Sequence, residues 1–453
     1  MQEQSAGFSI TIEHEHTKKL AITWLTLAIS ALLASGIFSI LLFLSRTPTV
    51  SEFIPWKDFF HTALVVHVDL SVFIWFMSFA GLLWTISTSR RLTGLGWLAV
   101  ILAIIGTIII TISPFTGEGN PLINNYIPIL DMPVFLWGLT IAGIGFGIVI
   151  IRTIITNLSL KQFTGGELAL RFGCYSGAIA AALSLILFIW AWLSLPAMEN
   201  KVVYYEYLFW GSGHTLQFTH ALLMMVVWIW LASVSGANIK LQPTTVIFLL
   251  GLCLLPAFAA PVIYHLYDVL SPDSRVNFTT LMKYGHLPLI LPGLFVALAI
   301  LQSGKSDISI RPVKNALIAS FILFTAGGII GFMIEGVNVV IPAHYHGSIV
   351  GVTLAFMGLT YMLLPQLGFK LPASRWARSQ PYIYGAGQLM HILGLAWSGG
   401  YGVQRKVAGA AQGLDTLAQK AGMGLMGMGG LVSTIGGVIF LVIVIRALLG
   451  KNK

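Results

Sequence analysis

The chain has 453 residues, of which 57% are hydrophobic and only 9% are charged, and its net charge is +9. Because soluble domains have about 25% charged residues, this composition excludes a water-soluble globular enzyme. The net positive charge is compatible with nucleic-acid binding, but the positions of the basic residues along the chain argue against a nucleic-acid partner.

Apolar segments long enough to cross a bilayer recur along the whole chain. A membrane-spanning helix needs about 20 apolar residues. The sequence predicts twelve such helices, at 19–46, 61–88, 94–114, 128–156, 168–195, 207–236, 245–270, 276–302, 313–333, 340–366, 379–400 and 425–449. They leave no room for a soluble domain of useful size. We therefore expect one all-helical integral-membrane domain over residues 1–453, with a short cytoplasmic N-terminal segment, 1–18.

The connections between the predicted helices differ in charge. Those that follow even-numbered helices are basic, and they contain Arg90, Arg91, Lys161, Lys240, Lys305, Arg311, Lys370, Arg375 and Arg378. Basic loops stay on the cytoplasmic side of a membrane. This pattern predicts a multi-pass protein with both termini in the cytoplasm. We expect it to lie in the cytoplasmic membrane of a prokaryote. The basicity then reflects topology and attraction to anionic lipids, so we expect no nucleic-acid partner.

Five histidines fall at a similar depth when this topology is applied. His67 and His214 lie about two turns inside the outer ends of the second and sixth helices. His265 is near the outer end of the seventh helix, and His344 and His346 are near the outer start of the tenth. Each one alone is compatible with a hydrogen-bonded polar group between helices. Five polar side chains at one depth of a membrane instead predict metal or haem ligation.

The tenth helix carries two of these histidines two residues apart. His344 and His346 point about 200° apart around a helix, so they face opposite sides. Since neutral imidazole is a common axial ligand of haem iron, such a helix suits a wall between two haems. The outer loop after the eleventh helix contains Arg405 and Lys406. These are either a solvated basic pair or the partners of haem propionates.

These motifs resemble the catalytic subunit, subunit I, of the haem–copper oxidase superfamily. AHYHG is similar to the HxH motif of that family's tenth helix, and HTALVVH ends at the position of its second-helix haem ligand. GSGHTLQF carries the histidine of its sixth helix, and QRK is similar to its basic pair after the eleventh. The resemblance covers nearly the whole chain. The fold that it implies is a polytopic bundle of twelve transmembrane helices.

The resemblance also implies the cofactors. His67 and His346 would ligate a low-spin haem that passes electrons, and His344 would ligate a high-spin haem with an open face. His214 and a seventh-helix residue would hold a non-haem metal, and a diatomic gas would be reduced between the two metals. We expect both haems to be of b type.

Two positions depart from the pattern of oxygen reductases in that family. Their usual tyrosine, four residues after the sixth-helix histidine, is Phe218 here. Their seventh-helix histidine pair is Tyr264 and His265, in PVIYHLYDV. Asp268 follows about 60° further round the helix, either as a metal ligand or as an interfacial carboxylate. With His214, His265 and Asp268 as ligands, iron is favoured over copper, because carboxylate is a hard ligand.

Both departures are similar to nitric oxide reductases of the superfamily, so the favoured reaction is 2 NO + 2 e⁻ + 2 H⁺ → N2O + H2O. The branch would be atypical, because Gln217 and Phe218 stand near the place of a usual glutamate and the other motifs are closer to B-type oxidases. One alternative is an oxygen reductase, a cytochrome or quinol oxidase subunit I, with Tyr264 or Tyr267 in the tyrosine role. Another is a haem electron-transfer or sensing subunit whose metal site has decayed. The five histidines disfavour a transporter without a cofactor.

Proton and electron supply are indicated only in part. Glu335 lies outside the tenth helix, close to His344, and we expect protons to enter there from the outer side without pumping. The chain has no CxxCH haem-attachment motif and no cysteine pair for a copper centre. We therefore expect an electron-donating subunit with a cytochrome c or cupredoxin domain on the outer face.

Overall fold

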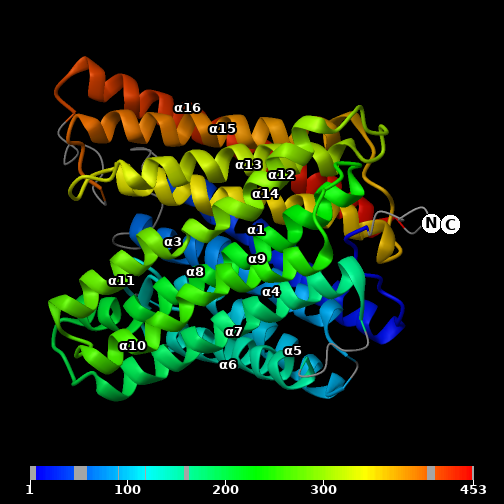
Figure 1. The fold of residues 1–453 in the computed structure, drawn as a ribbon. Coiled ribbons are helices and arrows are strands. Elements are labelled where there is room, and N and C mark those ends of the chain that lie inside the picture. Colours follow the sequence, from blue (N-terminus) through cyan, green and yellow to red (C-terminus); the bar gives the residue numbers. More distant parts are fainter. Residues whose placement is uncertain are drawn as a thin grey trace, which may run out of the picture. The chain divides into compact units, whose positions relative to one another are not determined.

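The computed structural model describes residues 7–44, 59–89, 91–117, 119–157, 163–405 and 414–450, and long helices dominate it (Figure 1). Contacts along the chain define two compact units. The first comprises Met1–Val226 and Leu241–Gly293, and the second comprises Val227–Lys240 and Leu294–Lys453. Lys406, one of the two predicted propionate partners, lies outside the described residues.

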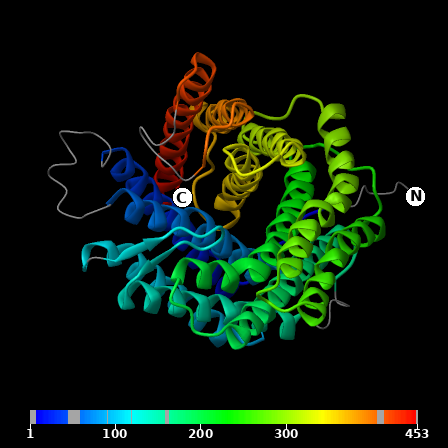
Figure 2. The same ribbon diagram turned by 90° about the vertical axis from the view of Figure 1, so that its left-hand side faces the viewer.

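The first unit contains the N-terminal helices and a short hairpin. Its helices are α1 (Glu15–Leu44), α3 (Phe59–Val68), α4 (Trp75–Ser87), α5 (Thr93–Ile112), α6 (Pro133–Thr156), α7 (Gly165–Ser194), most of α8 (Lys201–Val234), α9 (Pro243–Leu254), α10 (Ala259–Leu266) and α11 (Pro272–Gly285). A π-helical segment, Asp69–Ile74, joins α3 to α4. Strands β1 (Asn120–Leu122) and β2 (Ile129–Asp131) pair antiparallel between α5 and α6, with Leu122 opposite Ile129 (Figure 2, cyan).

The second unit contains the end of α8 and the C-terminal helices. These are most of α12 (Ile290–Gln302), then α13 (Arg311–Phe332), α14 (Val340–Gln366), α15 (Arg375–Gly400) and α16 (Leu417–Leu449). Helices α15 and α16 run side by side over most of their length (Figures 1 and 2). Among the helices of this unit that are long and apolar enough to cross a membrane, α14 is the most buried. It is the helix that carries the two closely spaced histidines.

Each of the twelve predicted spans corresponds to helical structure. Among the described residues, eleven helical segments are long and apolar enough to cross a membrane. Three of them combine two α-helices: α3 with α4, α9 with α10, and α11 with α12. The twelfth prediction, 379–400, forms α15, whose Arg378, Gln380 and His391 make it more polar. The expectation of a polytopic all-helical membrane protein is therefore confirmed.

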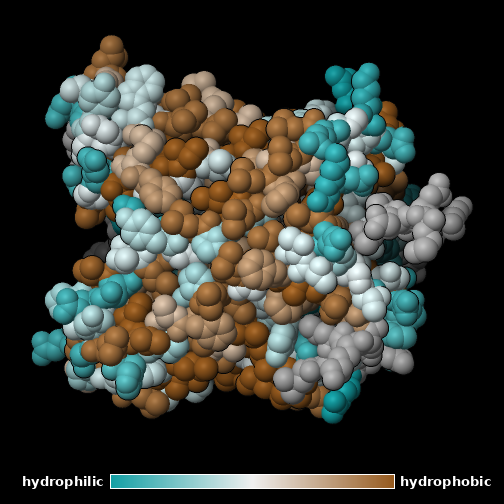
Figure 3. Space-filling model, viewed as in Figure 1, coloured by the Kyte–Doolittle hydropathy of each residue, from teal (hydrophilic) through white to brown (hydrophobic). Residues whose placement is uncertain are grey.

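The outer faces of the helices are apolar, as expected for contact with lipid. Along α5 the exposed residues Ile101, Ile105, Ile108 and Ile112 recur at helical spacing. Figure 3 shows hydrophobic residues along the flanks of the helices and hydrophilic residues gathered towards the helix ends. A surface of this kind is stable in a bilayer and would be an aggregation liability in water.

Glycines allow α15 and α16 of the second unit to approach each other closely. A Cβ atom added at Gly429 of α16 would lie 2.5 Å from the carbonyl oxygen of Gly387 and 2.9 Å from the Cα of His391, both on α15. By contrast, a Cβ at Gly427 of the same helix would meet nothing within 4 Å. The glycine at position 429 therefore permits the backbones of α15 and α16 to touch, as is common between membrane helices.

This contact predicts different effects for two substitutions in α16. We expect Gly429→Val to destabilise the protein by about 1–3 kcal/mol, the usual cost of overpacking. Gly427→Val should change stability by less than about 0.5 kcal/mol, as for exposed sites. Thermal denaturation in detergent, followed by size-exclusion chromatography, measures both. Equal stability of the two variants would contradict the proposed packing of α15 on α16.

Candidate haem-ligating and metal-ligating histidines

The histidine rings predicted to hold haem are each fixed through the same atom. The Nδ1 atom of His67 lies 2.9 Å from the carbonyl oxygen of Ser35. The Nδ1 of His344 lies 2.8 Å from the Gly327 carbonyl, and that of His346 lies 2.8 Å from the Pro342 carbonyl. A carbonyl oxygen only accepts, so Nδ1 carries the hydrogen in each ring and Nε2 keeps its lone pair. This is the arrangement that iron-ligating imidazoles require.

His67 is held by its own helix and by α1. The Ser35 hydroxyl of α1 lies 3.0 Å from the His67 Nδ1 and donates to the His67 carbonyl at 3.1 Å. The Ser71 hydroxyl donates to the same carbonyl at 2.7 Å. Ser71 belongs to the π-helical segment, a type of turn that is frequent at functional sites. The ring position is thus determined by α1 as well as by α3.

His344 and His346 point to different neighbours of α14, as their spacing predicts. A Cβ added at Gly331 of α13 would lie 2.6 Å from the Nδ1 of His344, so that ring fills the space beside a glycine. The His346 ring instead faces α15, where the centroid of the His391 ring is 5.0 Å away. His391 was not among the predicted site residues, and its Nδ1 is bound to the Met426 carbonyl at 3.0 Å.

His214 lies on α8 and is 2% exposed. Its Nδ1 has two oxygen neighbours, the Trp210 carbonyl at 2.7 Å and the Tyr126 hydroxyl at 2.6 Å. Tyr126 comes from the loop between β1 and β2. Burial, together with the nearby Glu206 carboxylate, raises the pKa of Tyr126 well above its usual range, so its phenol stays neutral. In His214, Nε2 is therefore the ring nitrogen that could bind a metal.

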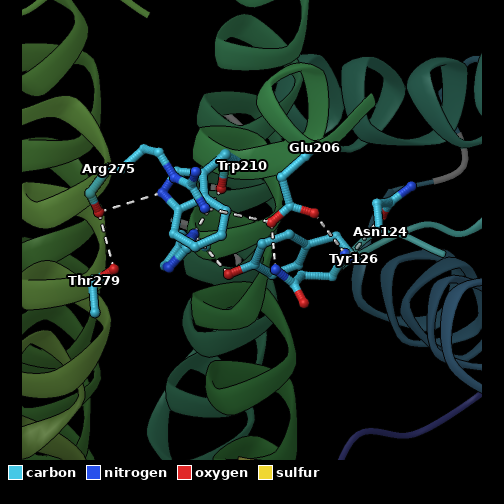
Figure 4. A network of polar contacts seen from close by, with 8 residues as sticks. Asn124, Tyr126, Glu206, Trp210, Arg275 and Thr279 are labelled. Atoms are coloured by element: carbon cyan, nitrogen blue, oxygen red, sulfur yellow. Dashed lines mark hydrogen bonds and ion pairs between the residues drawn. The ribbon is translucent and has the colours of Figure 1, made fainter. Parts of the chain in front are cut away.

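A network of polar contacts surrounds Tyr126 and α8 (Figure 4). The Glu206 carboxylate accepts from the backbone N–H of Asn125 at 3.0 Å and from the Asn125 side chain. On the other side it lies 3.8 Å from the Arg275 guanidinium of α11. Arg275 also lies over the Trp210 ring, 4.5 Å from its centroid. Neither Tyr126 nor this network was expected from the sequence.

The seventh predicted helix ends earlier than expected, and this changes the predicted position of Asp268 relative to His265. Helix α10 stops at Leu266, and Tyr267 is extended, so Asp268 is not on the helical face of His265. The Asp268 carboxylate accepts from the N–H of Leu270 at 2.8 Å, which closes a turn. His265 and Asp268 are exposed, whereas Tyr264 is buried against Gly211 of α8. The geometric argument that placed Asp268 beside His265 was therefore wrong.

The described part of the chain contains no group of three or more His, Cys, Asp or Glu side chains able to hold a metal ion. His214 fits a metal ligand by its burial and its free Nε2. The exposed His265 and Asp268 do not join it in this structure. The set of His214, His265 and Asp268 thus stays a prediction, and no reaction step is derived through it.

The remaining predicted residues lie as follows. Phe218 is 1% exposed, and its ring stacks on His286 with centroids 4.2 Å apart. Glu335 is exposed in the turn before α14, where its carbonyl accepts from the Asn338 side chain at 3.1 Å. Arg405 is half-buried, two residues after Val403, whose carbonyl accepts from the N–H of Val339 at 3.0 Å. This bond brings the predicted propionate partner to the start of α14.

Asp69 is a further residue that the sequence reasoning missed. It begins the π-helical segment and is 1% exposed, and both of its carboxyl oxygens are buried without a hydrogen-bond partner among the described residues. An acid two residues after a histidine in the apolar HTALVVHVDL was the available signal. A buried, unpaired carboxyl group is costly and is a functional indicator in membrane proteins.

The chain is similar to known proteins over most of its length. The sequence model of the family described as cytochrome c and quinol oxidase polypeptide I matches residues 19–439. An uncharacterized protein of Rickettsia prowazekii is 32% identical over 94% of this chain and 96% of its own length. Cytochrome c oxidase subunit 1 of Thermus thermophilus is 22% identical over 90% of this chain and 80% of its own.

The fold is also similar to a solved structure. A cryo-EM structure of a haem–copper terminal oxidase dimer matches with a TM-score of 0.68 and 17% identity, and the match covers 97% of this chain and 86% of that one. An uncharacterized protein of Aquifex aeolicus is 28% identical over 79% of this chain and 88% of its own length. The similarity thus extends over nearly all of the helices described above.

The unpaired Asp69 predicts an unusual gain in stability. Replacing a buried polar group that has no partner by an apolar one of similar shape is neutral or stabilising. We therefore expect Asp69→Leu to raise the free energy of unfolding by about 1–3 kcal/mol. A higher thermal midpoint in detergent would report this gain. Asp131→Leu is the control, because the Asp131 carboxylate pairs with Lys201 at 2.6 Å and its loss should not stabilise. A lower midpoint for Asp69→Leu would mean that the carboxyl group has a stabilising partner.

Proposed function

Because the chain belongs to the cytochrome c and quinol oxidase polypeptide I family, we propose that it is the catalytic subunit of a terminal respiratory reductase that reduces nitric oxide. Membership makes it a multi-pass membrane oxidoreductase of the terminal oxidase or reductase class. The observation that carries the choice of nitric oxide is Phe218. Its buried ring stacks on His286 and offers no hydroxyl where oxygen reductases of the family usually have a tyrosine.

Two b-type haems are proposed, with ligands from three helical positions. His67 and His346 would hold the low-spin haem, and His344 would hold the high-spin one. When bound, the haems supply electron transfer and an open iron coordination position for the gas. The chain contributes the ring orientations, because the carbonyls of Ser35, Gly327 and Pro342 each accept from the Nδ1–H of an imidazole. Nε2 is then the nitrogen that would bind iron. Arg405, with Lys406, would pair with propionates.

The second metal is proposed to be iron rather than copper, with His214 as the ligand that the geometry supports best. Its burial excludes water from the ring, and its Nδ1 is already occupied. Tyr264 is proposed for the same centre, whereas the exposed His265 and Asp268 do not gather with His214 among the described residues. Glu335 is proposed as the outer entry point for the two protons that 2 NO + 2 e⁻ + 2 H⁺ → N2O + H2O consumes, since its side chain is exposed in the turn before α14.

The proposed setting is the cytoplasmic membrane of a prokaryote, with both chain termini in the cytoplasm. The basic connections after even-numbered helices support this orientation. Electrons would come from a partner subunit with a cytochrome c or cupredoxin domain on the outer face.

A second candidate is oxygen reduction, O2 + 4 e⁻ + 4 H⁺ → 2 H2O. The specific observation in its favour is the Tyr126 hydroxyl, 2.6 Å from the Nδ1 of His214. This phenol comes from a loop instead of the sixth or seventh helix. It weakens the argument that a missing tyrosine excludes oxygen.

The haem ligands predict distinct spectra for three variants. His67→Ala and His346→Ala should each lose the low-spin haem signal, because a six-coordinate haem needs both axial imidazoles. His344→Ala should keep that signal but lose CO binding, which requires the high-spin haem. Optical difference spectra of purified protein, with His14→Ala as the control, measure these effects. A His344→Ala protein that still binds CO at wild-type level would contradict the assignment.

Gas turnover on one preparation tests the substrate. We expect N2O formation from NO, with non-haem iron present in addition to the haem iron. Gas chromatography, an oxygen electrode and elemental analysis measure these quantities together. Fast O2 uptake with bound copper would establish the second candidate instead. Haems without any further metal and without turnover would favour the electron-transfer or sensing role.

A further inference from the structure

His391 of α15 is an imidazole within the second unit that the proposed function does not use. Its ring centroid lies 5.0 Å from that of His346 on α14, and the two ring planes are inclined by 60°. Both residues are half-buried. A histidine within a membrane helix is costly, and such residues are commonly functional. An apolar side chain would fill the same space without that cost, so packing alone does not explain His391.

The His391 ring is anchored to α16. Its Nδ1 lies 3.0 Å from the carbonyl oxygen of Met426, and since a carbonyl only accepts, Nδ1 carries the hydrogen. Glycines of α16 lie beside this residue. A Cβ added at Gly430 would lie 3.6 Å from the same Nδ1, and one at Gly429 would lie 2.9 Å from the His391 Cα. The backbones of α15 and α16 are therefore close enough here for the Met426 carbonyl to reach the ring.

The His346 ring has aromatic neighbours on two helices. Its Nδ1 lies 2.8 Å from the Pro342 carbonyl, one turn earlier on α14, and this bond holds one atom of the ring. The Tyr345 ring centroid is 4.9 Å away with the planes inclined by 30°. Tyr345 belongs to the same helix and is exposed. His391 instead connects the His346 ring to α15 and, through the Met426 carbonyl, to α16.

From these contacts we propose that His391 is a positioning residue, which restricts the rotation of the His346 ring and so sets the orientation in which this ring ligates the low-spin haem. The proposal rests on the proposed function, in which His346 is an axial ligand. The ring fits that role, because Nε2 keeps its lone pair when the Nδ1–H is donated to the Pro342 carbonyl. Neighbours that orient a ligating imidazole also tune the metal that it binds.

Two substitutions of His391 test this assignment on the haem-loaded protein. His391→Phe keeps a ring and removes the N–H that binds the Met426 carbonyl, whereas His391→Ala removes the ring. We expect both variants to keep wild-type haem content. Both should shift the largest g value of the low-spin haem in electron paramagnetic resonance and its midpoint potential in a redox titration. The shift should be larger for His391→Ala, because no ring then remains beside His346.

Tyr384→Phe is the matched control. Tyr384 is an aromatic residue of α15 about 10 Å along the helix from His391, and it also lies against α16, since a Cβ added at Gly436 would be 2.7 Å from its Cα. Its substitution should leave the g value and the midpoint potential at wild-type level. A purely structural role of His391 would lower the thermal midpoint in detergent without moving either quantity.

Wild-type g values and midpoint potentials in both His391 variants would overturn the proposal, while leaving the ligand role of His346 intact. His391→Phe retains most of the side-chain volume, so it decides the question even if His391→Ala does not fold.

The variant His346→Ala separates a failure of this proposal from a failure of the proposed function. If it keeps the low-spin signal, or if the wild type has none, His346 is not the axial ligand and the proposed ligand set fails. The contact is then decided without haem, by nitrogen NMR of histidine-labelled protein, in which His346→Gln identifies the ring resonances. We expect His391→Phe to shift or broaden them. Unchanged His346 resonances in that variant would refute the positioning role.

Discussion

An imidazole between apolar helices needs an acceptor for its N–H group, and in the five histidines discussed next that acceptor is a main-chain carbonyl. His214 and His346 use the carbonyl four residues earlier on their own helix, whereas His67, His344 and His391 use a carbonyl of a neighbouring helix. In the second group the ring can be oriented only if the two helices are correctly packed. Helix packing and ligand orientation therefore depend on the same bond.

The pair of α13 and α14 shows how packing makes this bond available. Gly327 touches Gly347 so closely that a Cβ at Gly347 would lie 2.6 Å from the Gly327 Cα. The absence of side chains lets the Gly327 carbonyl reach the Nδ1 of His344 at 2.8 Å. A larger residue at either position would separate the helices and remove the acceptor. Part of the protein's high glycine content is thus explained by the orientation of a reactive side chain rather than by flexibility.

Local patterns in the sequence predicted the helices and the divergence of His344 from His346, because both follow from hydropathy and a fixed rotation per residue. The end of α10 was mispredicted, since Tyr267 leaves the helix within a segment that is still apolar. The contact of Tyr126 with His214 joins residues 88 positions apart. Hydrophobic periodicity cannot predict a contact of that kind. Gly213, which precedes His214, is related to it, because a Cβ atom there would overlap the Tyr126 ring. Asp69 could have been predicted from the sequence, because an acid within an apolar span is a functional signal.

The π-helical turn at Asp69–Ile74 has a consequence for how relatives of this chain are aligned. The N–H of Trp75 bonds to the carbonyl of Leu70, five residues back, where an α-helix would use four. Such a turn accommodates one additional residue, and each residue corresponds to about 100° of rotation. A homologue with a regular helix here would need a one-residue gap inside the span. An ungapped alignment would keep His67 matched and shift every buried position of α4 onto the wrong face.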